Sequence, residues 1–307
     1  MESKIRIGTR DSRLAVWQAT LVMEQLESAG HPAELVFIKS EGDIDLVTPL
    51  YAIGVQGVFT RNLDAALLSG RIDLAVHSMK DVPVQLAQGL RSAAVLPRAD
   101  PGDLLVLRND AAFLDDREGI ASIATSSLRR KAQWLHRYPN HRIEVLRGNV
   151  NTRLKKVALS DWNGALFATA GLDRIGQRPS SSLVMDWIVP APAQGAILVV
   201  CREGDEHLRV ACDPLHDEPS AACVHIERTF LSELMGGCST PVGALAEIRE
   251  GKLHFKGNIC SLDGKTCINV QRTVSLAAAA DIGREAALEL LDQGAASLIQ
   301  KISNSLT

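Results

Sequence analysis

The first half of the chain alternates short apolar runs with longer amphipathic patterns, and this alternation restricts its fold more than any other feature. The apolar run Ile5 to Gly8 precedes a pattern with apolar positions from Leu14 to Leu26, and a second apolar run, 34–39, follows after Gly30. Short apolar runs predict strands, and apolar residues recurring every three or four positions predict helices. Their alternation favours an α/β sheet with parallel strands, in which ligands bind where the carboxyl ends of strands meet helix amino ends.

The turn-rich segment 97–103, PRADPGD, separates two such α/β patterns, and a different pattern begins near Pro219. There a helix precedes strands at 253–258 and 267–274 and a helix at 280–293. The patterns therefore predict an α/β fold class, with two lobes joined by a hinge and a small α+β C-terminal domain. The run 196–201 is a strand that fits either lobe. The other expected strands are 72–77, 120–124, 143–146 and 165–168, and the other expected helices are 61–68, 128–137 and 150–159.

Arginines gather at the expected carboxyl ends of the strands. The chain has 33 Lys and Arg against 36 Asp and Glu, a formal net charge of -3, so no global field attracts an anion. A single loop arginine is usually a solvated surface group, but several at sheet edges favour a ligand with many carboxylates or phosphates, each able to accept two hydrogen bonds from one guanidinium. The arginines at these positions are Arg10, Arg129, Arg130, Arg147, Arg153 and Arg174.

The segment VHSMKDVP places His77, Lys80 and Asp81 at or just past the end of an expected strand. A carboxylate beside a lysine stays ionised and could face a cationic intermediate. The alternative is a salt-bridged turn that ends at Pro83. The residues alone leave both interpretations open.

Cys238 differs from the other cysteines, because two glycines precede it and a Ser-Thr-Pro turn follows it. An exposed loop of this kind suits a thiolate nucleophile, although the glycines could equally end a helix. The remaining cysteines stand in apolar or turn contexts, where we expect small buried side chains with reduced thiols. They are Cys201, Cys212, Cys223, Cys260 and Cys267.

Several classes of protein and site are disfavoured by what the sequence lacks. It has no phosphate-binding loop and no dinucleotide-binding glycine motif, so nucleotide binding loses support. The cysteine spacings do not resemble a metal site, and we expect no metal. The net charge and the lack of a long apolar run predict neither a nucleic-acid nor a membrane partner. The polar start of the sequence lacks the apolar core of a signal peptide, so we expect a cytoplasmic protein.

Seven segments together resemble the porphobilinogen deaminase (hydroxymethylbilane synthase) family, and they occur in the family's order over nearly the whole chain. They are IRIGTRDSRLAVWQA, DLAVHSMKDVP, ATSSLRRKAQ, VLRGNVNTRL, ATAGLDRIG, PAQGA and GGCSTPVGA. The resemblance implies two lobes built like those of periplasmic binding proteins and a third domain that carries a cofactor cysteine. It implies domain 1 at 1–98 with 196–216, domain 2 at 99–195 and domain 3 at 217–307.

The resemblance also implies a transferase that joins four porphobilinogen molecules head to tail, each losing ammonia, and releases hydroxymethylbilane for tetrapyrrole and heme biosynthesis. Cys238 would carry a covalent dipyrromethane cofactor as primer, and Asp81 would be the catalytic residue that stabilises the cationic states. His77 and Lys80 would position Asp81. Members of the family are typically monomeric, and we expect a monomer here.

The resemblance assigns binding roles to two further groups of residues. Cofactor-binding residues would be Arg129, Arg130, Lys80, Thr125, Ser126, Ser127, Asp43 and Gly171. Substrate-binding residues would be Arg10, Ser12, Gln18, Arg147, Asn149, Arg153, Arg174 and Gln194.

Two segments depart from the family's pattern. Gln56 and Arg61 stand where the family often has lysines, which predicts a less basic loop, and Glu41 stands where relatives commonly carry an arginine. Neither departure affects Asp81 or Cys238.

Two alternatives share the two-lobe architecture. A non-catalytic anionic solute-binding protein would also use arginines and hinge closure, but it normally has a signal peptide and does not need an exposed cysteine in a third domain. The effector domain of a transcription regulator would require a helix-turn-helix segment before the first strand, and none is evident.

Overall fold

The computed structural model describes residues 4–39, 60–234 and 240–306. The described residues form two compact units, one with 4–39, 60–99 and 195–222, the other with 100–194, 223–234 and 240–306. The helices are α1 (Arg13–Ser28), α2 (Arg61–Leu68), α3 (Leu128–Arg137), α4 (Val150–Leu159), α5 (Thr169–Asp173), α6 (Glu206–Cys212), α7 (Glu218–Glu233), α8 (Ile282–Leu290) and α9 (Ala296–Leu306). The strands are β1 (Ile5–Thr9), β2 (Ala33–Phe37), β3 (Leu74–Ser78), β4 (Leu90–Val95), β5 (Asp103–Leu107), β6 (Ser122–Ala124), β7 (Arg142–Glu144), β8 (Gly164–Ala168), β9 (Ser182–Val184), β10 (Ile197–Arg202), β11 (Val242–Arg249), β12 (Lys252–Cys260) and β13 (Cys267–Ser275).

The first unit is built on a five-stranded sheet in the order β2-β1-β3-β10-β4. Strand β1 pairs in parallel with β2 and β3, whereas β10 runs antiparallel to both β3 and β4. Successive side chains of a strand face opposite sides of its sheet, so Ile7 packs with Val22 of α1 while the neighbouring Gly8 approaches Leu63 of α2. Helices thus cover both faces of this sheet.

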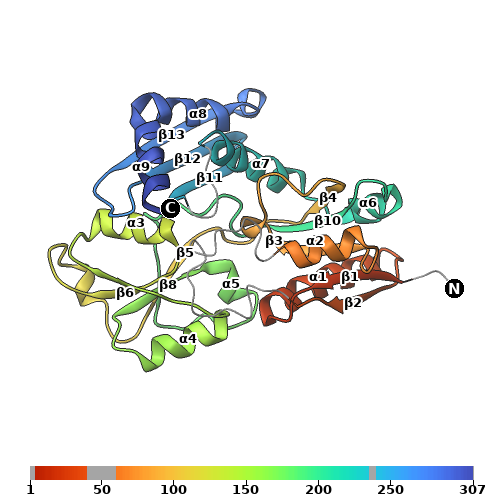
Figure 1. Ribbon diagram of the computed structural model, residues 1–307, viewed down its shortest axis with the longest axis horizontal. Coiled ribbons are helices and arrows are strands. Elements are labelled where there is room, and N and C mark those ends of the chain that lie inside the picture. The colour runs from red at the N-terminus through yellow and green to blue at the C-terminus, as the bar shows by residue number, and fades with distance from the viewer. Residues whose placement is uncertain (1–3, 40–59, 235–239, 307) are drawn as a thin grey trace. The chain divides into compact units, whose positions relative to one another are not determined.

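The second unit contains a sheet of the same plan, in the order β7-β6-β8-β5-β9. Its fourth strand, β5, runs antiparallel to β8 and β9, just as β10 does in the first sheet. One face packs on α4 through Val157 and the other on α3 through the fully buried Trp134, and Figure 1 shows these two helices on opposite sides of the sheet.

The same unit holds a three-stranded antiparallel sheet, β11-β12-β13. Phe255 of β12 lies edge-on to Phe230 of α7, with ring centroids 5.2 Å apart, and Ala286 of α8 belongs to the same apolar cluster. Two α/β lobes and a small α+β region confirm the expected fold class. The division into three domains at the stated boundaries stays a prediction.

The observed elements differ from the expectation in three places. The two lobes are not purely parallel, because β5 and β10 each enter their sheet from a segment that comes from the other unit and not from a helical crossover. The expected helix at 280–293 is divided into α8 and the π-helical turn Leu291–Ala295, in which Gly294, with φ 105°, interrupts the helical path before α9. Four of the described strands were not expected, β4, β5, β9 and β11, and neither were the helices α5, α6 and α9.

The cysteines also differ from the expectation of reduced thiols. Cys260 and Cys267 face each other directly in the β12–β13 hairpin and form a disulfide. Cys201, Cys212 and Cys223 are buried, as expected.

Among the described residues, no helix is both long enough and apolar enough to cross a membrane.

The packing of α8 on α7 depends on a glycine. A Cβ atom at Gly283 would lie 2.2 Å from the carbonyl oxygen of Ile226, a backbone atom that cannot rotate away. We therefore expect Gly283→Ala to lower the free energy of unfolding by about 1–3 kcal/mol, as for other overpacked sites. Urea unfolding measures the loss. Gly204→Ala is the matched control, because nothing lies within 4 Å of its added Cβ, and equal stability of the two variants would contradict the close packing.

Candidate functional site

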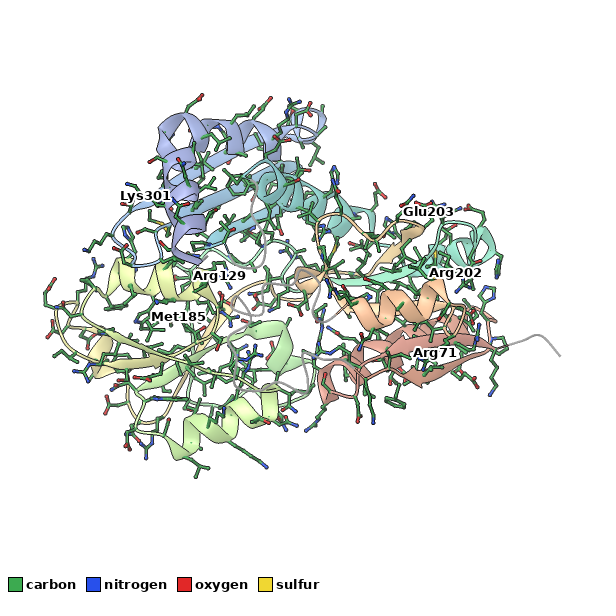
Figure 2. The ribbon with its side chains drawn as sticks, viewed as in Figure 1. Arg71, Arg129, Met185, Arg202, Glu203 and Lys301 are labelled. Atoms are coloured by element: carbon green, nitrogen blue, oxygen red, sulfur yellow. A yellow bond between two sulfur atoms is a disulfide. The ribbon has the colours of Figure 1, made fainter. Side chains whose placement is uncertain are left out.

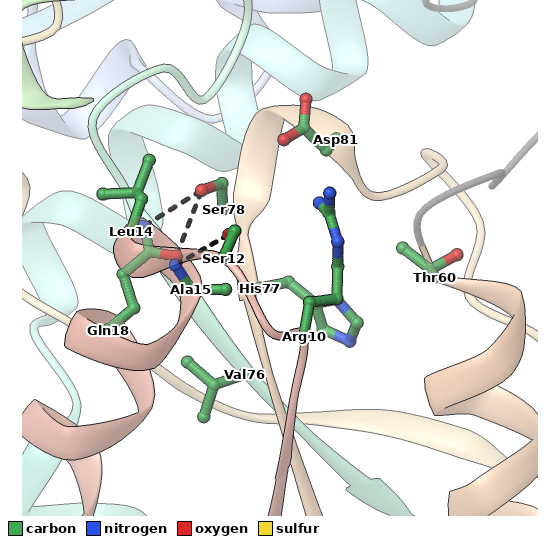
Figure 3. Close-up of a pocket in the computed structure, with 10 residues that line it drawn as sticks. All are labelled: Arg10, Ser12, Leu14, Ala15, Gln18, Thr60, Val76, His77, Ser78 and Asp81. Atoms are coloured by element: carbon green, nitrogen blue, oxygen red, sulfur yellow. Dashed lines mark hydrogen bonds between the residues drawn. The ribbon is translucent and has the colours of Figure 1, made fainter. Parts of the chain in front are cut away.

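The first unit contains a small cavity at the carboxyl ends of β1 and β3. Its volume is about 80 Å³, and its walls include Arg10, Ser12, Gln18, His77 and Asp81. Arg10 follows β1 directly, and Asp81 ends the 3₁₀ turn Met79–Asp81 that follows β3. Figure 3 shows the Arg10 side chain extending toward the Asp81 carboxylate. A guanidinium and a carboxylate predicted from separate motifs thus line the same cavity.

Local hydrogen bonds fix the wall of this cavity that α1 provides. Ser12 is the N-cap of α1, and its Oγ accepts a hydrogen bond from the Ala15 amide at 3.3 Å. The Gln18 amide nitrogen donates to Ser78 Oγ at 3.0 Å, which joins α1 to the end of β3 (Figure 3). Both side chains therefore have structural partners inside the unit.

His77 lies in β3 at the cavity and is only 6% exposed. Burial, with a smaller contribution from the Arg10 charge, lowers the pKa of His77 from 6.5 to about 4. Its Nε2 atom is buried without a hydrogen-bond partner among the described residues. The imidazole is therefore neutral at pH 7, and it adds no positive charge beside Arg10.

The lowered pKa of His77 predicts a loss of stability in mild acid. As the pH falls below 6.5, His77 becomes protonated in the unfolded chain, but in the folded chain it stays neutral until about pH 4. The folded state therefore loses stability between these two pH values. From pH 7 to pH 5 the loss is about 2 kcal/mol. Urea unfolding at both pH values measures this loss of stability, which should be smaller in His77→Gln than in wild type by that amount. The exposed His207→Gln is the control, and an equal pH effect in His77→Gln and wild type would contradict a neutral buried His77.

In the second unit, most predicted arginines lie where β6, β7 and β8 end. Arg129 and Arg130 occupy the first turn of α3 and are 5% and 6% exposed. Arg147 is equally buried in the loop before α4, and Arg153 lies within that helix. Figure 2 labels Arg129 at the start of α3.

A buried aspartate holds the two arginines of α3. Asp103, fully buried at the start of β5, accepts from Arg129 Nη1 at 2.7 Å and from Arg130 Nη2 at 2.7 Å. Burial alone would raise the pKa of Asp103, but the two guanidiniums outweigh it and hold the pKa below its usual range. Burial also lowers the pKa of Arg129, against the opposing effect of Asp103. We infer that all three groups are charged, because a guanidinium pKa lies far above neutrality.

The hydroxyl residues before α3 make hydrogen bonds within their own loop. Ser127 is the N-cap of α3 and accepts from the Arg130 amide at 3.4 Å, while Thr125 Oγ1 accepts from the Ser127 amide at 3.2 Å. Ser126 Oγ donates to the Leu146 carbonyl at 2.9 Å and so joins the β6 and β7 loops. These side chains shape the loop that presents the arginines.

The loop before α4 has a comparable construction. Asn149 is the N-cap of α4, and its Oδ1 accepts from the Thr152 amide at 3.0 Å. Gly148 has φ 110°, a conformation that favours glycine, and its carbonyl accepts from Arg153 Nε at 2.7 Å. The turn therefore places Arg147, Asn149 and Arg153 at one end of the sheet.

Two further predicted residues belong to or follow α5, the helix after β8. Gly171 lies within α5, and Arg174 is its C-cap. Burial lowers the pKa of Arg174 to about 10, so it remains a cation at pH 7. The second sheet thus gathers cationic side chains after three neighbouring parallel strands.

Gln194 and Lys80 are placed differently from the loop arginines. The Gln194 side-chain nitrogen lies 2.8 Å from Asp103 Oδ1 and 2.6 Å from the Pro101 carbonyl. Lys80 lies in the 3₁₀ turn beside Asp81 but is not among the residues that line the cavity.

Two predicted residues lie outside the described part of the chain. They are Asp43 and Cys238. Glu41 and Gln56, which depart from the family's pattern, also lie outside the described residues. Arg61 is described and begins α2.

The structure adds Asp103 to the candidate site, a residue that the sequence analysis missed. Its segment, PRADPGD, has the composition of a turn, and its arginine partners lie 26 and 27 positions away. The only local signal was a carboxylate directly before the apolar run 104–107.

Comparisons with known proteins cover nearly the whole chain. Residues 5–210 match the family described as "Porphobilinogen deaminase, dipyromethane cofactor binding domain", and residues 221–292 match "Porphobilinogen deaminase, C-terminal domain". The chain belongs to the porphobilinogen deaminase family. This confirms the resemblance that the sequence motifs indicated.

Three curated relatives in this family carry the name porphobilinogen deaminase. The protein of Syntrophotalea carbinolica is 44% identical over 298 residues, covering 95% of this chain and 94% of its own length. The protein of Desulforamulus reducens is 38% identical and covers 98% and 99%, and that of Carboxydothermus hydrogenoformans is 39% identical and covers 98% of each.

Similar solved structures include the methionine-binding protein MetQ and the VFT2 domain of Bordetella pertussis BvgS. MetQ has a TM-score of 0.42 and 14% identity, covering 74% of this chain and 90% of its own. The BvgS domain has a TM-score of 0.41 and 14% identity, covering 67% and 84%. Similarities at this level carry no argument about function.

Proposed function

We propose that the chain is a transferase that condenses four porphobilinogen molecules head to tail with loss of ammonia and releases hydroxymethylbilane for tetrapyrrole and heme biosynthesis. The family match over residues 5–210 and 221–292 supports this activity. The observation in the structure that carries it furthest is the cavity that holds both Asp81 and Arg10. A carboxylate there can stabilise the cation that porphobilinogen becomes when it loses ammonia, and the guanidinium can bind a substrate carboxylate.

The residues present fit a dipyrromethane cofactor. Each pyrrole ring carries two carboxylates, and the buried Arg129 has an Nε donor with no partner among the described residues. Arg129, Arg130, Lys80, Thr125, Ser126, Ser127, Asp43 and Gly171 would hold this group, which would be attached to Cys238. When bound, the cofactor supplies the pyrrole ring to which the first substrate is joined.

The substrate-binding residues follow from the same charge argument. Arg10, Arg147, Arg153 and Arg174 would neutralise carboxylates that accumulate as the product grows. Ser12 and Asn149 add polar groups at the same strand ends, and Gln18 holds the cavity wall through Ser78.

Domain division, localisation and assembly state complete the proposal. The three domains would be 1–98 with 196–216, 99–195, and 217–307. The protein would act in the cytoplasm as a monomer on the small molecule porphobilinogen, with no nucleic-acid or membrane partner. A non-catalytic solute-binding role is not favoured, because the family match includes the C-terminal domain.

Covalent attachment at Cys238 gives a direct mass prediction. The purified protein should exceed its sequence mass by one dipyrromethane, and Cys238→Ser should lack this excess, because an alcohol is a poor substitute for a thiolate nucleophile. Intact mass spectrometry measures both. Cys212→Ala is the control and should keep the excess, since burial raises the pKa of that thiol to about 12. An excess that persists in Cys238→Ser would place the attachment elsewhere.

The catalytic role of Asp81 is tested by Asp81→Asn, which keeps the side-chain size but removes the charge. Loss of one electrostatic stabiliser costs about 3–4 kcal/mol in the transition state, so ammonia release per folded, cofactor-loaded molecule should fall roughly a hundredfold to a thousandfold. Thermal unfolding should change little.

Asp110→Asn is a matched control for this experiment. Asp110 precedes another 3₁₀ turn, Ala112–Leu114, and its side chain accepts from the Ala112 amide at 3.0 Å. This variant should release ammonia at the wild-type rate. Near-normal release by Asp81→Asn, with lowered thermal stability, would instead assign Asp81 to a structural turn.

A further inference from the structure

Asp103 makes more polar contacts than the two ion pairs alone. Its Oδ1 atom accepts from Arg130 Nη2 at 2.7 Å, Arg130 Nε at 3.1 Å and the Gln194 side-chain nitrogen at 2.8 Å, while Oδ2 accepts from Arg129 Nη1 at 2.7 Å. The carboxylate is 0% exposed. Both oxygens are therefore occupied by protein donors, which leaves Asp103 no role as a direct ligand of a small molecule.

The same contacts fix the direction of both guanidiniums. Arg129 Nη1 also donates to the Val189 carbonyl at 2.8 Å, and Arg130 Nη1 donates to the Leu166 carbonyl at 3.2 Å. Because a guanidinium is a planar fork, two or three fixed bonds define the plane of the whole group. The remaining donors of Arg129 and Arg130 are therefore held in place before any ligand binds.

The charges of this cluster do not cancel. Among the described residues, two guanidiniums face one carboxylate, so one positive charge remains on groups that are at most 7% exposed. An uncompensated buried charge is costly, and an arriving anion relieves that cost.

A second aspartate, Asp73, lies in a cluster whose positive and negative charges are equal in number. Asp73 also bonds two arginines, accepting from Arg6 Nη2 at 2.8 Å and Arg202 Nη2 at 3.4 Å. Arg202 has a second carboxylate partner in Asp205, so the cluster holds two cations and two anions. Its arginines are 38% and 25% exposed, which lets water share their charge.

We propose that Asp103 is a positioning residue for the deaminase reaction: it orients Arg129 and Arg130 and leaves the pair one net positive charge for a carboxylate of the pyrrole ligand. Gln194 belongs to the same arrangement, because its amide donates to Asp103 and to the backbone at Pro101. The inference rests on the proposed function, since it requires a pyrrole ligand whose carboxylate binds the remaining positive charge of the cluster.

The test measures cofactor loading and stability separately. Full-length protein is produced in cells that make no porphobilinogen, and porphobilinogen is then added. The gain of one dipyrromethane is followed by intact mass and divided by the folded fraction from thermal unfolding. Asp103→Asn should be less stable and should load at least tenfold more slowly per folded molecule, because the guanidiniums lose the carboxylate that fixes their orientation.

Asp73→Asn is the matched control. It also removes a carboxylate charge between two arginines, but in the balanced cluster, so it should lower stability and load at the wild-type rate per folded molecule. Loading of Asp103→Asn at the rate of Asp73→Asn would reduce Asp103 to a structural role and overturn the inference.

Asp103→Glu covers the case in which Asp103→Asn fails to fold. It keeps the charge and both ion pairs but displaces the carboxylate by one methylene, so it should fold and load several-fold more slowly than wild type. Wild-type loading by this variant would overturn the positioning role. A wild-type protein that gains no mass would instead overturn the proposed function itself, and the inference with it.

Discussion

The compensation of buried charge at Asp103 is the interaction on which much of the second unit depends. This carboxylate belongs to the first residue of β5 and bonds the first turn of α3 and the Gln194 side chain. Removing one partner of a buried ion pair typically costs about 3–5 kcal/mol, because the other charge is left without water or a counterion. Arg129 and Arg130 are therefore bound into the fold by Asp103, and are not solvated surface side chains.

The two α/β sheets place their polar residues by the same rule. In each, three neighbouring strands run in parallel and a fourth runs against them. The parallel strands end on one side of the sheet, and the segments that follow them contain Arg10 and Asp81 in one unit and Arg129, Arg147 and Arg174 in the other. Helix N-caps such as Ser12, Ser127 and Asn149 stand at these ends, where the helix dipole favours anions.

Elements with strong local signals were predicted well from the sequence. Helices α3 and α4 have the expected bounds, because Ser127 and Asn149 cap their starts. Strand β5 was missed since Asp103 lies in a segment rich in turn residues, and its burial depends on partners far along the chain. The Cys260–Cys267 pair was also missed, because only the register of β12 against β13 brings the two residues opposite each other.

The candidate site was likewise predicted from the sequence only in part. The sequence motifs indicated that Arg10 and Asp81 matter, since both follow predicted strands, but no local pattern could show that they line one cavity with His77. That arrangement follows from the parallel pairing of β1 with β3. The burial that keeps His77 neutral is likewise a property of the packed sheet and not of the motif.

The position of β10 in the first sheet has a consequence for biosynthesis. The five strands of the second sheet lie between residues 103 and 184, whereas the first sheet needs residues 197–202 to fill the place between β3 and β4. A ribosome synthesises the chain from its amino end, so every strand of the later sheet leaves the ribosome before the earlier sheet has its fourth strand. Until β10 is synthesised, no strand lies between β3 and β4, so the first sheet is completed only after all strands of the second sheet have been synthesised.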